Sequence, residues 1–131
     1  MRNVITDAVV LPATADRLFE MYLDPAQHAS FTGFPVTIGA VAGAKFEAFE
    51  GQLSGQILQL VESRLIVQSW RSTQFRDEDP DSTLILSFTP AGDQGRIDLV
   101  HLDVPDHDVD GVTQGWQQFY WTPWSEWLKR R

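Results

Sequence analysis

The sequence contains no cysteine among its 131 residues. Disulfide bonds, thiol catalysis and thiolate metal sites are therefore excluded, and stability must come from packing. The chain also lacks a long uninterrupted apolar run, and its first residues lack the pattern of a secretory signal. We therefore expect a protein of the cytoplasm that does not span a membrane.

Positive charge is scarce as well. The chain has 10 Lys and Arg residues against 18 Asp and Glu residues, which gives a formal net charge of -8. Such a field repels phosphate backbones and anionic lipid head groups, so we expect neither nucleic acid nor a membrane surface as a partner. A chain of this length with 43% hydrophobic residues predicts a single domain over residues 1–131.

Aromatic residues, in contrast, are concentrated near the C-terminus. Four of the five tryptophans lie there: Trp116, Trp121, Trp124 and Trp127. Each buried indole removes roughly 150 to 250 Å² from water, which is worth about 4 to 6 kcal/mol. On a helix over residues 109–129, the aromatic side chains would share an arc of roughly 200°. Pro123 removes one amide donor, and we expect it to bend this helix near Phe119.

The N-terminal third predicts a strand followed by two short helices. The strand is expected over residues 4–11, where apolar residues run up to a proline. The first helix is expected over residues 14–23, with Thr14 as its N-cap. The second helix is expected to have Asp24 as its N-cap and Pro25 in its first position, and it should stop before Gly33.

The middle of the chain predicts an antiparallel meander, because short apolar segments alternate with turn residues from 36 to 102. Its clearest strand covers residues 83–88, where Leu84, Leu86 and Phe88 form one apolar face. A hairpin loop at 91–95 leads into a strand at 96–102. Residues 52–61 and 65–71 form a similar pair, and residues 77–81 form an acidic loop.

Several segments also resemble one known family. The segment 41–51 (VAGAKFEAFEG) with Gly55, followed by Leu60 and 66–71 (IVQSWR), is similar to the activators of the heat-shock-protein-90 ATPase. The later landmarks that match are Ser82-Thr83, Val104-Pro105, Gly115-Trp116, Tyr120 and Pro123. The resemblance implies an α+β, START-like helix-grip fold of the birch-pollen-allergen type. That fold has a curved antiparallel sheet of six to seven strands, two short helices and a long C-terminal helix.

The resemblance also implies a function, because stand-alone members are similar to domains that hold a small ligand between helix and sheet. Our leading hypothesis is a non-enzymatic domain that binds a small hydrophobic or aromatic molecule without a cofactor. The expected cavity walls are Phe31, Phe34, Phe46, Phe49, Trp70, Trp116, Phe119 and Tyr120. A hydroxyl of Tyr120 or a histidine such as His28 would supply a polar contact. A void of roughly 300 Å³ or more would favour this hypothesis.

Two alternatives remain open. The first is a co-chaperone-like or stress-response protein that contacts a chaperone or a client protein through an exposed apolar patch. The second is a cyclase or dehydratase-type enzyme on the same fold, which would need a buried titratable pair in the cavity. Glu47 and Glu50 cannot be assigned as acid and base from sequence, so we name no catalytic residue.

Three further patterns favour structural roles. Ser54 is preceded by glycine at the wrong spacing for a nucleophile elbow, so Gly51 and Gly55 indicate a bent strand instead. The His and Asp residues between 101 and 110 lack the spacing of a metal site. Trp70 and its neighbour Arg71 should face opposite sides of a strand, with Trp70 as a cavity wall.

The aromatic helix itself should divide into two parts. Trp116, Phe119 and Tyr120 are expected to form the ceiling of the cavity. Trp121, Trp124 and Trp127 are expected to pack against the sheet and the short helices and to close the core.

Overall fold

The protein is described by a computed structural model that covers residues 3–131. Its seven strands form one sheet in the order β1-β7-β6-β5-β4-β3-β2, with every neighbouring pair antiparallel. The strands are β1 (Asn3–Leu11), β2 (Val36–Thr37), β3 (Lys45–Ala48), β4 (Leu53–Val61), β5 (Leu65–Ser72), β6 (Ser82–Ala91) and β7 (Gln94–Val104). The first strand thus pairs with the last, and the intervening strands form the predicted meander.

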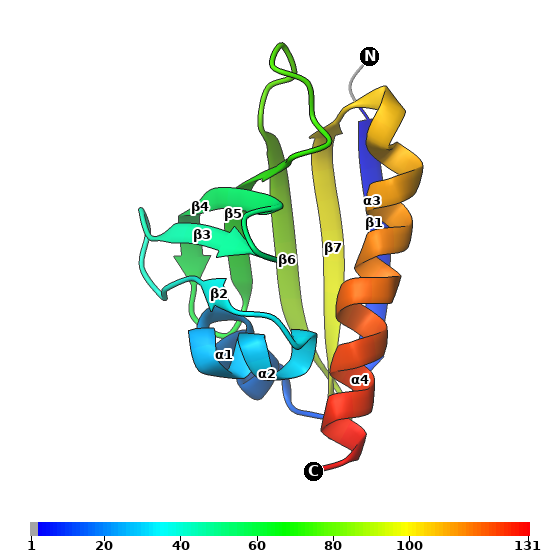
Figure 1. Ribbon diagram of the computed structural model, residues 1–131. Helices are drawn as coiled ribbons and strands as arrows, with labels where there is room; N and C mark the ends of the chain where they lie inside the picture. The colour runs from blue at the N-terminus through cyan, green and yellow to red at the C-terminus, as the bar shows by residue number, and fades with distance from the viewer. Residues whose placement is uncertain (1–2) are drawn as a thin grey trace.

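The helices lie on one face of this sheet (Figure 1). The two short ones are α1 (Ala15–Leu23) and α2 (Pro25–Thr32). A short 3-10 turn η1 (Asp106–Asp108) then leads into a long C-terminal helix made of α3 (Val109–Gly115), the π-helical segment η2 (Trp116–Trp121) and α4 (Thr122–Lys129). The long helix runs along β7 and β1, and α1 and α2 lie beside its C-terminal part (Figure 1). The predicted α+β helix-grip fold is confirmed.

The residues predicted to cap the two short helices, and the glycine predicted to end the second, have these roles in the structure. The Thr14 hydroxyl accepts the Arg17 amide at 3.2 Å and caps α1. Asp24 accepts amides at the start of α2, and Gly33 ends this helix in the left-handed conformation at a φ of 85°. The local sequence is therefore sufficient to start and stop both short helices.

The core lies between the sheet and the helices, and the strand alternation supplies it. Leu84, Leu86 and Phe88 are all buried, as the period of two predicts. Opposite them on the same face, Ile97 and Leu99 of β7 are also buried. None of the helices within residues 3–131 is long and apolar enough to cross a membrane.

The sheet curves where β4 approaches β5 at Gly55. A Cβ atom at this position would lie 1.9 Å from the backbone oxygen of Ser69, so only glycine allows the two strands to come this close. A register irregularity follows between Ile57 and Gln59. Ser54 is an ordinary strand residue paired with Arg71, which agrees with the structural role predicted for it.

The long helix departs from α geometry just before Pro123. The amide of Thr122 donates to the carbonyl of Gln117, five residues earlier, and the wider π turns cover Trp116–Trp121. A proline ring would collide with the carbonyl four residues before it, here that of Phe119, so the widened turns accommodate Pro123. The sequence predicted a disturbance at this place, and the structure accommodates it with π turns in a helix that continues to Lys129.

Candidate ligand cavity

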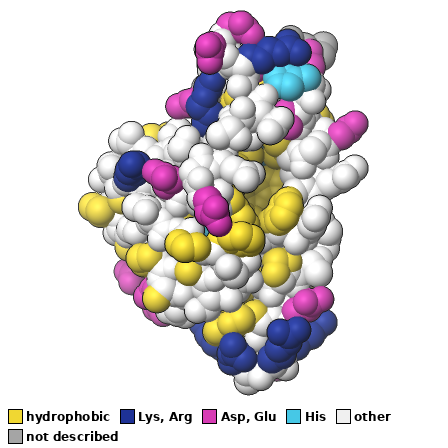
Figure 2. All heavy atoms as spheres, viewed as in Figure 1, with side chains coloured by type: hydrophobic (Ala, Val, Ile, Leu, Met, Phe, Trp, Pro, Cys, Tyr) yellow, Lys and Arg dark blue, Asp and Glu magenta, His cyan; other side chains and the backbone are white. Residues whose placement is uncertain are grey.

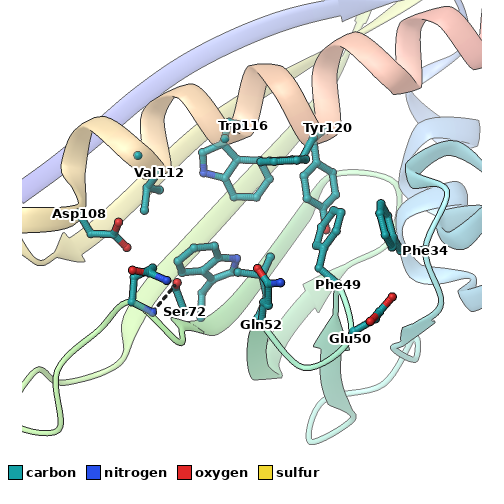
Figure 3. Close-up of a pocket in the computed structure, with 15 residues that line it drawn as sticks. Phe34, Phe49, Glu50, Gln52, Ser72, Asp108, Val112, Trp116 and Tyr120 are labelled. Atoms are coloured by element: carbon teal, nitrogen blue, oxygen red, sulfur yellow. Dashed lines mark hydrogen bonds between the residues drawn. The ribbon is translucent and has the colours of Figure 1, made fainter.

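A cavity with a volume of about 450 Å³ opens between the N-terminal half of the long helix and the far strands of the sheet. Figure 2 shows hydrophobic side chains gathered around a hollow in the middle of this face. Six aromatic residues line it: Phe34, Phe49, Trp70, Trp116, Phe119 and Tyr120. The other lining residues are Glu50, Gln52, Leu53, Ser72, Gln74, Asp108, Gly111, Val112 and Gly115 (Figure 3).

The π turns decide which aromatic residues share the inner face of the helix. Trp116 and Trp121 are five residues apart, a spacing that points to different faces of an α-helix but to nearby positions on a π-helix. Their rings stack with centroids 5.6 Å apart, and both are buried. Tyr120 packs against Trp116 at 4.9 Å. The cavity ceiling is therefore a compact group of rings.

The position of Trp116 is held by a chain of buried hydrogen bonds. Its indole N–H donates to Nδ1 of His101 at 3.2 Å. Because this nitrogen accepts, the proton of the neutral ring is on Nε2, which donates to the Ser82 hydroxyl at 2.8 Å. That hydroxyl in turn donates to the backbone oxygen of Trp70 at 2.6 Å. One histidine thus connects the ceiling tryptophan to the strand that carries the wall tryptophan.

Tyr120 is held by a second buried histidine, His28 of α2. The ring donates from Nδ1 to the Tyr22 carbonyl at 2.7 Å, since a carbonyl can only accept. Nε2 then accepts the Tyr120 hydroxyl at 2.9 Å. Loss of hydration lowers the pKa of His28 to about 4 and that of His101 to about 3, so both rings are neutral at physiological pH. His28 is accordingly a core histidine with both ring nitrogens hydrogen-bonded, and it is not among the lining residues that could supply the polar contact expected from the sequence.

The floor of the cavity is carried by β5. Trp70 and Arg71 near the end of this strand face opposite sides, as predicted. Trp70 is buried in the cavity wall, whereas Arg71 is half-buried and turns to the following loop. Arg71 donates to the backbone oxygens of Asp79 and Arg76, each at 2.7 Å. Trp70 packs against His101 with ring centroids 4.7 Å apart. The arginine therefore braces the loop, and the tryptophan shapes the cavity.

One side of the cavity mouth is formed by a strained hairpin turn between β3 and β4. Phe49, Glu50 and Gly51 follow one another in the left-handed region, with φ values of 51°, 58° and 86°. For a residue as bulky as phenylalanine this conformation is unfavourable, so surrounding contacts must maintain it. Phe49 packs against Phe34 at 5.3 Å and against Phe119 at 5.6 Å. The turn thus places an aromatic ring and a carboxylate at the mouth.

The polar part of the lining includes a carboxylate that has no hydrogen-bond partner within the described residues 3–131. Asp108 occupies the N-cap position of α3, yet its side chain makes no capping hydrogen bond. It is half-buried, and loss of hydration raises the pKa of its carboxyl group, although nearby His107 opposes the shift. Figure 3 shows Asp108 at the end of the cavity where α3 begins and Glu50 at the other end, beside Phe49 and Phe34.

Of the eight residues that the sequence suggested as cavity walls, six line it. Phe31 and Phe46 do not, because both are fully packed in the core next to α2. Phe31 stacks on Trp124 with centroids 4.1 Å apart, and Phe46 packs against His28 at 6.4 Å. Phe34 and Phe119 are 42% and 46% exposed, so they form the rim. Their role toward a ligand stays a prediction.

The polar lining residues, above all Gln52, Ser72 and Asp108, were not predicted from the sequence. Asp108 could have been singled out because it precedes the last helix, but its expected interaction with the helix terminus concealed it. Ser72 carries no sequence signal beyond its position two residues after Trp70, on the same face of the strand.

The His and Asp residues around residue 105 are dispersed. His101 is buried under Trp116, whereas His107 is exposed and contacts the Gln74 carbonyl at 2.9 Å. Asp106 accepts a hydrogen bond from Asn3 at 2.6 Å. Within residues 3–131 no group of three His, Asp or Glu side chains could hold a metal ion.

A curved antiparallel sheet that carries a long C-terminal helix across an open aromatic cavity defines a helix-grip domain of the START-like class. Residues 12–123 match the family "Activator of Hsp90 ATPase homolog 1-like protein", and the chain belongs to this family. The resemblance seen in segments 41–51 and 66–71 is thereby confirmed.

A sequence relative agrees with this family assignment, and solved structures share the fold. "Activator of 90 kDa heat shock protein ATPase homolog 2" of Mus musculus is 29% identical over 105 residues, which cover 80% of this chain but only 31% of that protein. An HSP90 activator from Plasmodium falciparum has a similar fold, with a TM-score of 0.76, 20% identity and coverage of 92% and 90% of the two chains. Protein MLL2253 of Mesorhizobium loti gives a TM-score of 0.83 at 14% identity, with 98% of each chain covered.

Proposed function

We propose that this domain is a non-enzymatic binding protein that holds a small hydrophobic or aromatic molecule in the cavity between the long helix and the sheet. The observation that carries the proposal is the volume of about 450 Å³ bounded by six aromatic residues. This volume lies within the range of about 300 to 1,000 Å³ that is typical of ligand sites, which are mostly apolar with a few polar groups. A sealed core of the same composition would have no such space.

The hydrogen bonding of the buried histidines supports a binding role. His28 and His101 each use both ring nitrogens within the protein, so neither has a free nitrogen to exchange a proton with a ligand. The two lining carboxylates lie at opposite ends of the cavity and do not form a pair (Figure 3). A cyclase or dehydratase would need such a group at its reacting centre.

Titration with the neutral fluorescent dye Nile red tests the proposal. We expect saturable binding and a rise in melting temperature with dye concentration. Trp116→Ala should change the dissociation constant by about tenfold, which corresponds to about 1.4 kcal/mol. Trp127→Ala is the matched control, because Trp127 is outside the lining and packs under Arg131 at 4.4 Å. Absence of saturable binding, or equal effects of both variants at matched folding, would contradict the proposal.

A second candidate is contact with a chaperone, favoured by the names of the relatives, which describe activators of the 90 kDa heat shock protein ATPase. The exposed rings of Phe34 and Phe119 would then belong to an apolar contact patch. A pull-down with the heat-shock-protein-90 chaperone of the same cell, followed by an ATPase assay, discriminates between the two candidates. No binding at micromolar concentration would end the chaperone hypothesis.

A further inference from the structure

The charge of the cavity lining is one-sided. Among residues 3–131 the lining contains the two carboxylates Asp108 and Glu50, and no Lys, Arg or His side chain. In Figure 2 the basic side chains of this face lie away from the central hollow, mostly at its upper and lower ends. A ligand in this cavity therefore meets aromatic faces and negative charge.

Asp108 is the carboxylate best placed to act on a ligand. It is half-buried, and among residues 3–131 it has no hydrogen-bond or ion-pair partner, in contrast to Asp98, which pairs with Arg96 at 2.9 Å. A partly desolvated carboxylate that forms no ion pair is unfavourable, and a bound cation would offset that cost beyond the weak effect of nearby His107. The helix beside it provides room, because Gly111 and Gly115 both line the cavity without a side chain.

The aromatic walls favour the same kind of ligand. Trp70 and Trp116 lie with ring centroids 6.4 Å apart, and indole faces attract cations through their quadrupole. A carboxylate or sulfonate would experience repulsion from Asp108 and Glu50 and would find no cationic partner in the lining. The negative charge of the lining and the aromatic rings therefore both favour a cationic ligand over an anionic one.

We propose that the cavity selects small aromatic molecules that carry an amine or another positively charged group, with the cation at the Asp108 end and the ring against Trp70 and Trp116. This inference rests on the proposed ligand-binding function and names the chemical class of the ligand. Glu50, which is exposed at the other end, contributes only a weaker and salt-screened attraction.

Three naphthalene probes of matched size test the inference by isothermal titration calorimetry on the full chain at low salt. The probes are naphthylmethylammonium, naphthylmethanol and naphthoate. We expect the ammonium probe to bind about tenfold more tightly than the alcohol, and the carboxylate more weakly than the alcohol. Asp108→Asn should reduce the preference for ammonium over alcohol to about twofold, because it removes the charge and keeps the shape.

Asp110→Asn is the matched control, since Asp110 is exposed on the same helix and outside the lining. It should leave the preference unchanged. Folding is preserved in both variants, because asparagine is favourable near a helix N-terminus and Asp108 makes no capping bond to lose.

The outcomes separate the two proposals. Equal binding of the ammonium and alcohol probes, or a preference that persists in Asp108→Asn, would overturn the charge selectivity and leave the binding function intact. Binding of none of the three probes, together with no binding of Nile red, would overturn both.

Discussion

The two halves of the long C-terminal helix have opposite relations to the rest of the molecule. The first half, through Tyr120, borders an open cavity and includes two glycines, Gly111 and Gly115, on its lining face. The second half is sealed: Trp124 is fully buried and stacks on Phe31 with an interplanar angle of 4°. Both halves are rich in aromatic residues, so aromatic content alone does not distinguish a wall from a core. The difference is made by what lies opposite the helix.

The sheet and the short helices explain this difference. Opposite the second half lie α2 and β1, and the Trp121 indole donates to Asp7 of β1 at 3.0 Å. Opposite the first half lies the cavity, whose other wall comes from β4 and β5 through Leu53, Trp70 and Ser72. The same helix therefore closes the core at one end and leaves a cavity at the other.

The largest expected effect comes from replacing a buried tryptophan in the sealed half of the helix by alanine. Trp124→Ala should lower the free energy of unfolding by about 3 to 5 kcal/mol, because it removes a fully packed indole. Trp116→Ala should cost at least about 1 kcal/mol less, since one side of Trp116 already faces the cavity. Urea unfolding followed by circular dichroism measures both values. Equal losses would show that the two halves are packed alike.

The second expected effect is acid destabilisation through the two histidines that hold the ceiling rings. In the unfolded chain their pKa values are near 6.5, whereas in the folded protein they fall to about 4 for His28 and about 3 for His101. Lowered folded pKa values mean that the stabilisation is complete above pH 6.5 and is lost as the pH falls below it. The expected slope is up to about 1.4 kcal/mol per pH unit for each histidine.

Urea unfolding at pH 7, 6 and 5 measures this slope above the range where most carboxylates titrate. His107→Asn is the control, because the His107 side chain is exposed and supports neither of the ceiling rings. A stability that is constant from pH 7 to pH 5 would contradict the assignment of both histidines as neutral, buried supports.

The smallest expected effect is a gain in stability. Gly115→Ala should raise the free energy of unfolding by about 0.5 to 1 kcal/mol, because alanine is the better helix former. The added Cβ would meet only Phe119 Cδ2 at an ordinary 3.7 Å. Gly111→Ala should gain less, since its Cβ would lie 3.1 Å from Oδ1 of Asp108. If Gly115→Ala destabilised the protein, the first half of the helix would be packed more tightly than the cavity implies.

Much of the fold could be predicted because its signals are local. The Thr14 and Asp24 caps, the Gly33 stop and the alternation of Leu84, Leu86 and Phe88 each act within a few residues. The candidate site was harder to predict, because a cavity is the space that remains after segments distant in the sequence pack together. Phe31 and Phe46 illustrate this, since they are aromatic like the true wall residues, yet Phe31 of α2 stacks on Trp124 and Phe46 packs against His28 in the core.

The order of helices and strands, the acidic character and the membership of the family follow from the sequence, since these depend on local patterns and on matched residues along the chain. Which aromatic rings face the cavity, and where its charge lies, depends on the packing of the folded chain. The π turns bring Trp116 and Trp121 together, a buried hydrogen bond joins Tyr120 to His28 across 92 residues, and the Asp108 side chain makes no capping hydrogen bond at the start of α3. These outcomes depend on how α2, the curved sheet and the long helix pack against one another, which no local pattern specifies.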